Sequence, residues 1–151
     1  MVQGKNTSSA TASWTDRPRQ VNHFHVAAGI LHDRSGRVLI PERLCDGPFD
    51  GLWEFPGGKI GDNESSGEAL KRELAEELGI EVTDAKTFME LHHEYPDRIV
   101  DLEFFLVSEW NGEPEGLEGQ GVRWLPARDL DPDELLPADA PVVAAIQQIL
   151  S

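Results

Sequence analysis

From Gly58 to Ile80 the chain reads GKIGDNESSGEALKRELAEELGI, which contains the clearest helix signal in the sequence. Ser65 and Glu68 have the spacing of a capping box, in which each side chain bonds a backbone N–H of the first helical turn. Leucines recur every four residues, at Leu70, Leu74 and Leu78. That spacing predicts a helix with one buried face. Gly79 stands where a left-handed residue ends a helix.

Three glutamates belong to the same predicted helix: Glu73, Glu76 and Glu77. At about 100° per residue, Glu77 lies ~20° and Glu73 ~60° from Leu70, so both border the apolar stripe. Like charges at this spacing destabilise a bare helix. A hard, oxygen-preferring cation removes that penalty, which predicts Mg²⁺ or Mn²⁺ binding. The alternative is a solvated acidic face.

Two charged residues near these glutamates, Arg72 and Glu64, are open to more than one interpretation. Arg72 is either an ordinary surface arginine or a group that hydrogen-bonds a nearby carboxylate and fixes its orientation. Glu64 precedes the helix, where a negative charge interacts favourably with the positive end of the helix dipole.

The flanking sequence predicts short strands on both sides of the helix, separated by turns. The predicted strands are 26–31, 37–41, 52–55, 87–94, 99–109 and 122–125. Segments 45–51 and 111–121 are predicted loops because they are rich in glycine, and 141–150 is a predicted closing helix. These elements indicate an α/β fold with a mixed sheet between helices.

The chain is strongly acidic, with 28 Asp and Glu residues against 13 Lys and Arg and a formal net charge of −15. Such a surface disfavours binding to nucleic-acid polymers or anionic membranes. Cys45 is the single cysteine, so no intrachain disulfide can form. Without a secretory signal or a run of ~20 apolar residues, we expect a cytoplasmic location. We also expect a monomer. We further expect a disordered tail at residues 1–20 and one domain at 21–151.

The stretch that opens at Gly58 also matches a longer pattern at every fixed position. The pattern is Gly, five residues, Glu, seven residues, Arg-Glu, an aliphatic residue, one residue, Glu-Glu, one residue, Gly and an aliphatic residue. It resembles the signature of the Nudix hydrolases. The segments LWEFPGGK (52–59), YPDR (95–98), WNGEPEGLEGQ (110–120) and LLPADAPVV (135–143) extend the similarity over residues 24–146, towards the MutT-like branch. The resemblance implies the Nudix fold, with a mixed β-sheet sandwiched between α-helices.

The resemblance also implies roles for individual residues. Mg²⁺, with Mn²⁺ as a substitute, would be bound by the backbone carbonyl of Gly57 and by the carboxylates of Glu73, Glu76, Glu77 and Glu118. Glu77 or Glu118 would remove a proton from the water that attacks the β-phosphorus of a nucleoside triphosphate. Arg43 and Lys59 would bind the triphosphate, and the base would be bound by Phe55, Arg98 and Asp139. Phe55 fits a plain core position equally well.

Asp139 departs from the MutT-like pattern, which has asparagine at this position. An amide both donates and accepts hydrogen bonds, whereas an ionised carboxylate only accepts. Asp139 can accept from the N7–H of 8-oxoguanine, but it faces the neighbouring O6 unfavourably unless it is protonated or shifted. It also suits the exocyclic amine of cytosine. Alternatively, it caps the closing helix.

Three functions therefore remain open. The first is hydrolysis of 8-oxo-dGTP to 8-oxo-dGMP and pyrophosphate, which protects DNA replication by cleaning the nucleotide pool. The second is the same chemistry on CTP, 5-methyl-dCTP or another nucleotide. The third is a nucleotide-binding module without catalysis, which the intact glutamate pattern disfavours.

Overall fold

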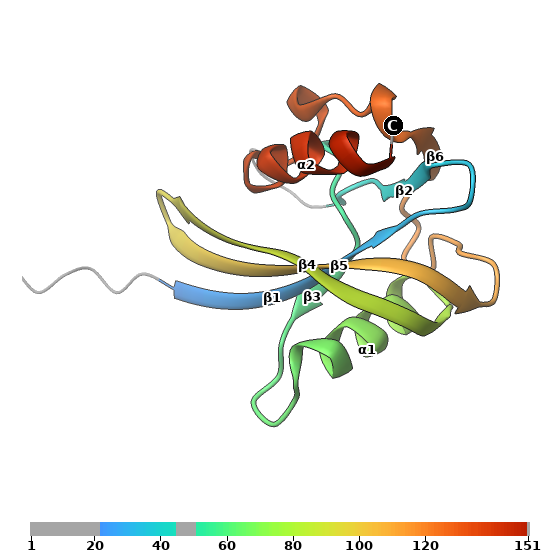
Figure 1. Cartoon of the computed structure of the whole chain (residues 1–151). Helices are drawn as coiled ribbons and strands as arrows, with labels where there is room; N and C mark the ends of the chain where they lie inside the picture. Colours follow the sequence, from blue (N-terminus) through green and yellow to red (C-terminus); the bar gives the residue numbers. More distant parts are fainter. Residues whose placement is uncertain (1–21, 45–50, 151) are drawn as a thin grey trace, which may run out of the picture.

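The computed structural model describes residues 22–44 and 51–150 (Figure 1). Its strands are β1 (Asn22–Leu31), β2 (Arg37–Pro41), β3 (Gly57–Lys59), β4 (Glu81–Tyr95), β5 (Arg98–Asn111) and β6 (Val122–Pro126). Its α-helices are α1 (Ser66–Leu78) and α2 (Ala140–Leu150), and three 3-10 helices precede α2: η1 (Ala127–Asp129), η2 (Pro132–Glu134) and η3 (Pro137–Asp139). The predicted tail at 1–20 and most of the predicted loop at 45–51 lie outside the described residues.

The main sheet is mixed, with the strand order β3-β1-β5-β4. Strands β1 and β5 run parallel, whereas β3 and β4 run antiparallel to their neighbours. Strands β2 and β6 form a separate antiparallel pair. The long strands β4 and β5 form a hairpin whose ladder is interrupted between Val82 and Asp84 and between Thr87 and Met89, and the hairpin curves across the molecule (Figure 1).

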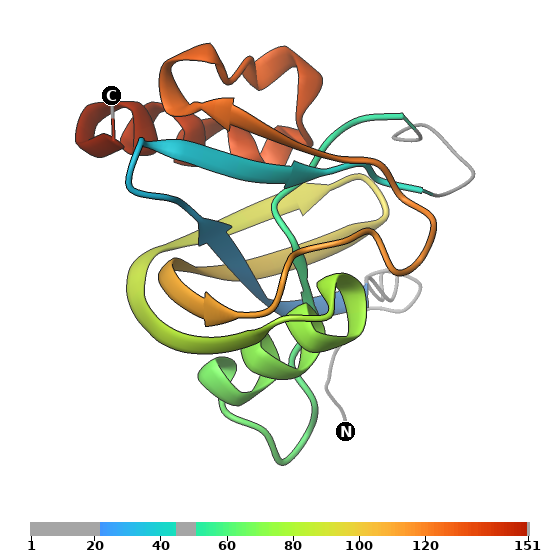
Figure 2. The same cartoon turned by 90° about the vertical axis from the view of Figure 1, so that its right-hand side faces the viewer.

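The two α-helices lie on opposite sides of the main sheet (Figures 1 and 2). Successive side chains of a strand point to opposite faces. Ala27 of β1 accordingly packs in the core under α1, and Ala28 packs in the core under α2. The α1 core includes Leu70, Leu74, Leu78 and Val107, and the α2 core includes Val142, Ile146, Ile30 and Phe104. This arrangement confirms the predicted α/β fold with a mixed sheet between helices.

Helix α1 has the ends that the sequence predicts. The Ser65 hydroxyl accepts from the Glu68 N–H at 3.1 Å, and the Glu68 carboxylate accepts from the Ser65 N–H at 2.9 Å. Gly79 ends the helix at φ 72°, in the left-handed region, and its N–H donates to the Ala75 carbonyl. The three stripe leucines are fully buried. Local capping and one apolar face therefore fix both the length and the orientation of α1.

The predicted strand at 52–55 is wrong, because the strand lies further along the chain, at β3. Trp53 makes only isolated bridges, to Glu42 and Leu135. The chain pairs with β1 only after Pro56, where a Cβ atom on Gly57 would lie 2.1 Å from the Ala27 carbonyl oxygen. Only glycine permits that approach. The predicted strands 87–94 and 99–109 are correct in type but extend further, as β4 and β5.

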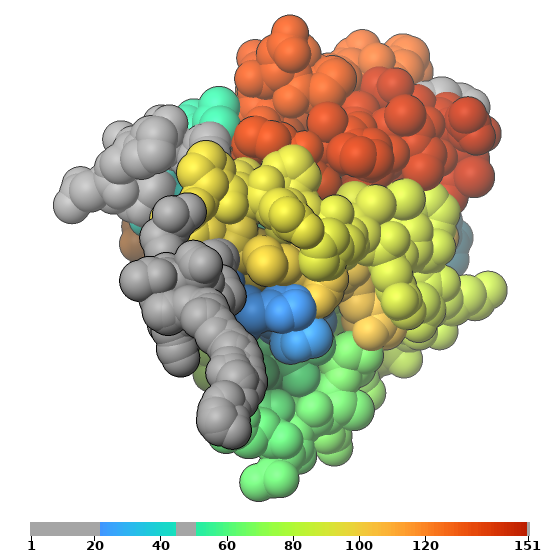
Figure 3. All heavy atoms as spheres, turned by 90° about the vertical axis from the view of Figure 1, so that its left-hand side faces the viewer, coloured from blue at the N-terminus to red at the C-terminus, as the bar shows by residue number. Residues whose placement is uncertain are grey.

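Figure 3 shows the face of the molecule on which β1 begins. The described start of β1, in blue, is at the surface between the green segment that contains α1 and the yellow part of the β4–β5 hairpin. Within residues 22–44 and 51–150, no helix combines the length and the apolar character needed to cross a bilayer.

Candidate active site

Arg72 connects the acidic residues around α1. Its Nε and Nη2 atoms donate to the two carboxylate oxygens of Glu64 at 2.6 and 2.9 Å. Its Nη1 atom donates to Glu73 at 2.9 Å and to Glu76 at 3.4 Å, and Nη2 also donates to the Lys59 carbonyl at 3.0 Å. The Arg72 hydrogen bonds, followed by the Gly61 N–H, lower the pKa of Glu64 to about 2. This network supports the orienting role considered for Arg72 and gives Glu64 a partner that the sequence did not reveal.

Glu73 lies directly against β3. A Cβ atom on Gly58 would lie 2.3 Å from Cδ of Glu73 and within 2.5 Å of both its carboxylate oxygens. Any side chain at position 58 must therefore displace the Glu73 carboxylate. The two glycines thus have different structural roles. Gly57 lets β3 approach β1, and Gly58 leaves room for the Glu73 carboxylate.

The glycine-rich loop at 111–121 brings Glu118 to the end of α1. The Leu117 N–H donates to the Glu77 carbonyl at 3.0 Å. Gln120 accepts from the Glu118 N–H at 2.8 Å and donates to the Glu77 carbonyl at 3.4 Å. The small cavity beside this loop, which we call the acidic cavity, is lined by four carboxylates: Glu42, Glu54, Glu77 and Glu118.

The electrostatics of the acidic cavity suit a hard divalent cation. Burial raises the pKa of Glu77 to about 8, and repulsion from Glu73, Glu118 and Glu54 adds to the effect. In the described part of the chain, no three of these carboxylates bring oxygens within 4.8 Å of one another. Their donors are all oxygens, the ligands preferred by Mg²⁺. A bound divalent cation would offset the repulsion between them.

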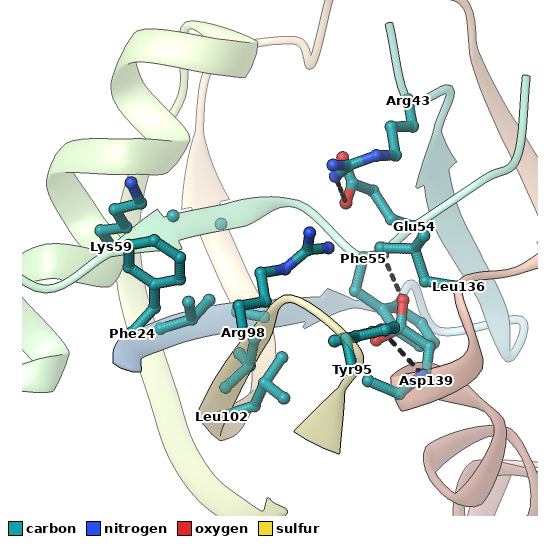
Figure 4. Close-up of a pocket in the computed structure, with 16 residues that line it drawn as sticks. Phe24, Arg43, Glu54, Phe55, Lys59, Tyr95, Arg98, Leu102, Leu136 and Asp139 are labelled. Carbon is teal, nitrogen blue, oxygen red and sulfur yellow. Dashed lines mark hydrogen bonds and ion pairs between the residues drawn. The ribbon is translucent and has the colours of Figure 1, made fainter. Parts of the chain in front are cut away.

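A larger cavity of about 370 Å³ lies beside the acidic cavity (Figure 4). We call it the nucleotide cavity, and its volume is in the range of small-molecule sites. Glu54 lines both cavities, so the two are neighbours. The nucleotide cavity contains every residue that the sequence assigned to substrate binding: Arg43, Phe55, Lys59, Arg98 and Asp139. Gly57 lines it as well.

Three cations surround this largely apolar cavity (Figure 4). Nη1 of Arg43 lies 3.2 Å from the Glu54 carboxylate. Nζ of Lys59 lies 4.0 Å from the centre of the Phe24 ring, and the Arg98 guanidinium lies 4.6 Å from the centre of the Tyr95 ring. Positive charge at this position favours an anionic ligand in an otherwise acidic protein.

Phe55 and Asp139 form the inner end of the nucleotide cavity (Figure 4). Phe55 is 5% exposed, and its ring packs edge-on against Phe104 at 5.9 Å between centroids. Phe55 is thus both a core residue and a cavity wall. The Asp139 carboxylate accepts a hydrogen bond from the Phe55 N–H at 3.4 Å. Among the described residues it makes no bond to the first turn of α2, so the capping alternative is not supported.

Asp139 is buried in a way that favours its neutral form. Only 3% of the residue is exposed. Burial, followed by the charge of Glu54, raises its pKa to about 8, although the Phe55 N–H and Arg43 act in the opposite direction. A carboxyl group with this pKa is mostly protonated at pH 7. It can therefore donate as well as accept hydrogen bonds, as an amide does.

Sequence reasoning assigned no role to two other residues of the nucleotide cavity, Glu54 and Tyr95. Burial raises the pKa of Glu54, whereas Arg43 lowers it. A glutamate between Trp53 and Phe55 in an extended segment was a usable signal, because it points away from the face of its apolar neighbours. The Tyr95 hydroxyl accepts from the Ala138 N–H at 3.3 Å. This bond ties the end of β4 to η3, which carries Asp139.

Known proteins share a large part of this sequence. Residues 23–146 match the model of the NUDIX domain family. The 8-oxo-dGTP diphosphatase of Escherichia coli K12 is 39% identical over 126 residues, which are 83% of this chain and 98% of that protein. The CTP pyrophosphohydrolase of the same organism is 36% identical over 126 residues, or 83% of this chain and 93% of that protein.

A solved structure shows the same fold. It comes from a study of MutT from Aliivibrio salmonicida and Vibrio cholerae, and it aligns with a TM-score of 0.71 at 35% identity. The alignment covers 83% of this chain and 97% of the solved chain. The matched fold, the complete glutamate pattern on α1 and the family match over residues 23–146 lead to one conclusion: this chain is a member of the Nudix hydrolase family.

Proposed function

We propose that this protein is a magnesium-dependent nucleoside triphosphate pyrophosphohydrolase that converts 8-oxo-dGTP into 8-oxo-dGMP and pyrophosphate. The observation that carries the proposal is the burial of Asp139 at the inner end of a cavity that adjoins a carboxylate cluster, because this burial raises the pKa of Asp139 and favours its neutral form. Removal of 8-oxo-dGTP would clean the nucleotide pool before DNA replication.

Residues that line the acidic cavity and others on α1 and β3 would carry out the chemistry together. Glu73, Glu76, Glu77 and Glu118, with the Gly57 carbonyl, would hold Mg²⁺. When bound, the cation supplies charge neutralisation for the triphosphate and lowers the pKa of the attacking water. Glu77 or Glu118 would take the proton of the attacking water, and both carboxylates line the acidic cavity. Arg72 acts through Glu73, whose carboxylate it orients.

The cations of the nucleotide cavity suit the remaining parts of the substrate. Arg43 and Lys59 would bind the phosphates, and Arg98 and Phe55 would flank the base. Arg98 is held over the Tyr95 ring. These contacts position the nucleotide without specifying which base it carries.

Asp139 is the residue that we assign to base selection. Guanine presents two acceptors, N7 and O6, on this edge. In 8-oxoguanine N7 carries a hydrogen, so the edge presents a donor beside an acceptor. A neutral carboxyl group presents the complementary acceptor and donor. The match explains how aspartate can replace the asparagine of the MutT-like pattern.

CTP is the second candidate substrate, because one of the relatives is named a CTP pyrophosphohydrolase. The exocyclic amine of cytosine lies beside the N3 acceptor, and a neutral carboxyl group can pair with that edge too. Hydrogen-bond complementarity at Asp139 therefore excludes unmodified guanine more strongly than it excludes cytosine.

The pH dependence of substrate preference tests the role of Asp139. We expect the ratio of kcat/KM for 8-oxo-dGTP over dGTP to fall as pH rises through about 8, where Asp139 loses its proton. The Asp139→Asn variant should keep a high ratio across this range, because the amide does not titrate. An exposed residue on η2 offers a matched control, Asp133→Asn, which should behave like the wild type. A ratio that falls equally in wild type and Asp139→Asn would remove Asp139 from base selection.

A further inference from the structure

A second group of metal-ligating side chains lies outside the cavities described above. His23 and His25 are on β1, Asp101 is on β5 and His92 is on β4. The strand register pairs His25 with Asp101 and Asp101 with His92, so these three form one row across three neighbouring strands. Directly paired residues share a face of the sheet, and His23 shares it because it lies two residues before His25.

The distances within this group are short. Nε2 of His23 lies 2.5 Å from Oδ2 of Asp101, and Nδ1 of His92 lies 2.6 Å from Oδ1 of the same carboxylate. The rings of His23 and His25 stack with their centroids 4.9 Å apart. One ligand atom from each of His23, His25 and Asp101 lies within 4.8 Å of the other two.

This group is separate from the proposed active site. His23 and His25 alternate with Phe24 and Val26, which line the nucleotide cavity on the other face of β1. The histidines share the face of Ala27. Ala27 is buried in the α1 core, whereas His23 and His25 are exposed and lie nearer the start of the strand. The sheet therefore lies between the two groups of side chains.

The surroundings of the histidine group favour a cation. Glu90 and Glu103 are paired across β4 and β5 on the same face and line the hollow beside His25, His92 and Asp101. Among the described residues, none gives an imidazole nitrogen of His25 a hydrogen bond, so that ring can accept a metal ion without losing a partner. His92 is held between Asp101 and Glu94, at 2.6 and 3.0 Å.

We propose that His23, His25 and Asp101 form a binding site for a divalent transition metal ion of the Zn²⁺ or Ni²⁺ class, with His92 positioning the Asp101 carboxylate. Two imidazoles and one carboxylate are the donors that such ions prefer, whereas Mg²⁺ prefers oxygen donors alone. A four-coordinate ion with bonds of about 2.0–2.1 Å needs its ligand atoms roughly 3.3 Å apart. Both histidines are exposed, so rotation of their side chains can close the remaining distance.

Calorimetric titration of the full chain with Zn²⁺ in excess Mg²⁺ tests this site. Because the carboxylates of the acidic cavity could also take Zn²⁺, the titration is repeated in the Glu73→Gln/Glu77→Gln double variant, where the histidine site should remain. We expect His25→Gln or Asp101→Asn to remove one equivalent of Zn²⁺ or to weaken its binding at least tenfold. A matched control is His93→Gln, because His93 follows His92 but points to the other face, with its ring 4.4 Å from that of Tyr95.

Two further measurements separate metal ligation from general effects. The imidazole proton signals of His23 and His25, assigned through the single His→Gln variants, should shift when one equivalent of Zn²⁺ is added, and those of His93 should not. The rate of nucleotide hydrolysis in Mg²⁺ should be the same in His25→Gln as in wild type. An unchanged rate would show that this variant is correctly folded. If wild type and His25→Gln give the same isotherm, or if wild type in excess Mg²⁺ takes up no Zn²⁺, the proposed site does not exist.

Discussion

Replacement of Asp139 by asparagine should stabilise the protein at neutral pH and have much less effect in acid. The pKa of Asp139 is about 8 in the folded protein, against a reference value of 3.8. Between these two values the folded state binds one more proton than the unfolded state. The contribution of Asp139 to stability is therefore most favourable below about pH 4 and becomes less favourable as pH rises towards 8.

The size of the effect follows from the same two values. Each pH unit within this window changes the free energy of unfolding by about 1.4 kcal/mol for one group. Asparagine cannot titrate, but its carbonyl oxygen can still accept from the Phe55 N–H. The free energy of unfolding of Asp139→Asn, relative to that of the wild type, should therefore increase by about 3 kcal/mol between pH 5 and pH 7.

Urea unfolding at pH 5, 6 and 7 measures this difference by linear extrapolation. For the exposed control Asp133→Asn, the free energy of unfolding relative to wild type should not change between pH 5 and pH 7. A difference between Asp139→Asn and wild type that stays constant across these pH values would mean that Asp139 is ionised in the folded protein. The argument for its role in reading 8-oxoguanine would then fail as well.

Other perturbations test the acidic cavity. Glu77→Gln should lower kcat by about 10²–10⁴-fold, which is the usual contribution of a general base. It should also raise the thermal midpoint, because it relieves repulsion between carboxylates. Near-normal pyrophosphate release would refute a catalytic role for Glu77. Arg72→Lys keeps the charge but loses the paired hydrogen bonds to Glu64. In steady-state assays kcat/KM should therefore fall about 10–100-fold. A smaller loss would mean that Arg72 does not orient the carboxylates. Gly58→Ala should displace Glu73 and weaken Mg²⁺ activation, which an activity titration against Mg²⁺ detects as a higher half-saturating concentration. Removal of divalent ions with a chelator should abolish activity, Mg²⁺ or Mn²⁺ should restore it, and activity that persists in the chelator would contradict the metal requirement.

Local signals made α1 the most predictable part of the fold. Its cap at Ser65, its end at Gly79 and its leucine stripe depend on residues within one turn or two of one another. Strand β3 was misplaced because its position depends on Ala27 and Ala28, some thirty residues earlier, which admit only glycine opposite them. A pattern confined to 52–59 cannot contain that information.

The residues of the nucleotide cavity could be predicted as a set, but their chemistry could not. Resemblance to the MutT-like branch selected Arg43, Phe55, Lys59, Arg98 and Asp139, and the structure places all of them around one cavity. The protonation of Asp139 depends on its burial and on Glu54, which is distant in sequence. The group of His23, His25 and Asp101 likewise depends on the parallel register of β1 and β5, which no local pattern predicts.

The assignment of 8-oxo-dGTP as the substrate can be tested by comparing hydrolysis of several nucleotides in Mg²⁺. Pyrophosphate release from 8-oxo-dGTP, dGTP, CTP and 5-methyl-dCTP should be compared by kcat/KM, with the Glu77→Gln variant as the blank. We expect kcat/KM for 8-oxo-dGTP to exceed that for dGTP by several orders of magnitude and to exceed that for both cytosine nucleotides. A profile led by CTP or 5-methyl-dCTP, or one that is flat across the panel, would contradict the assignment of 8-oxo-dGTP.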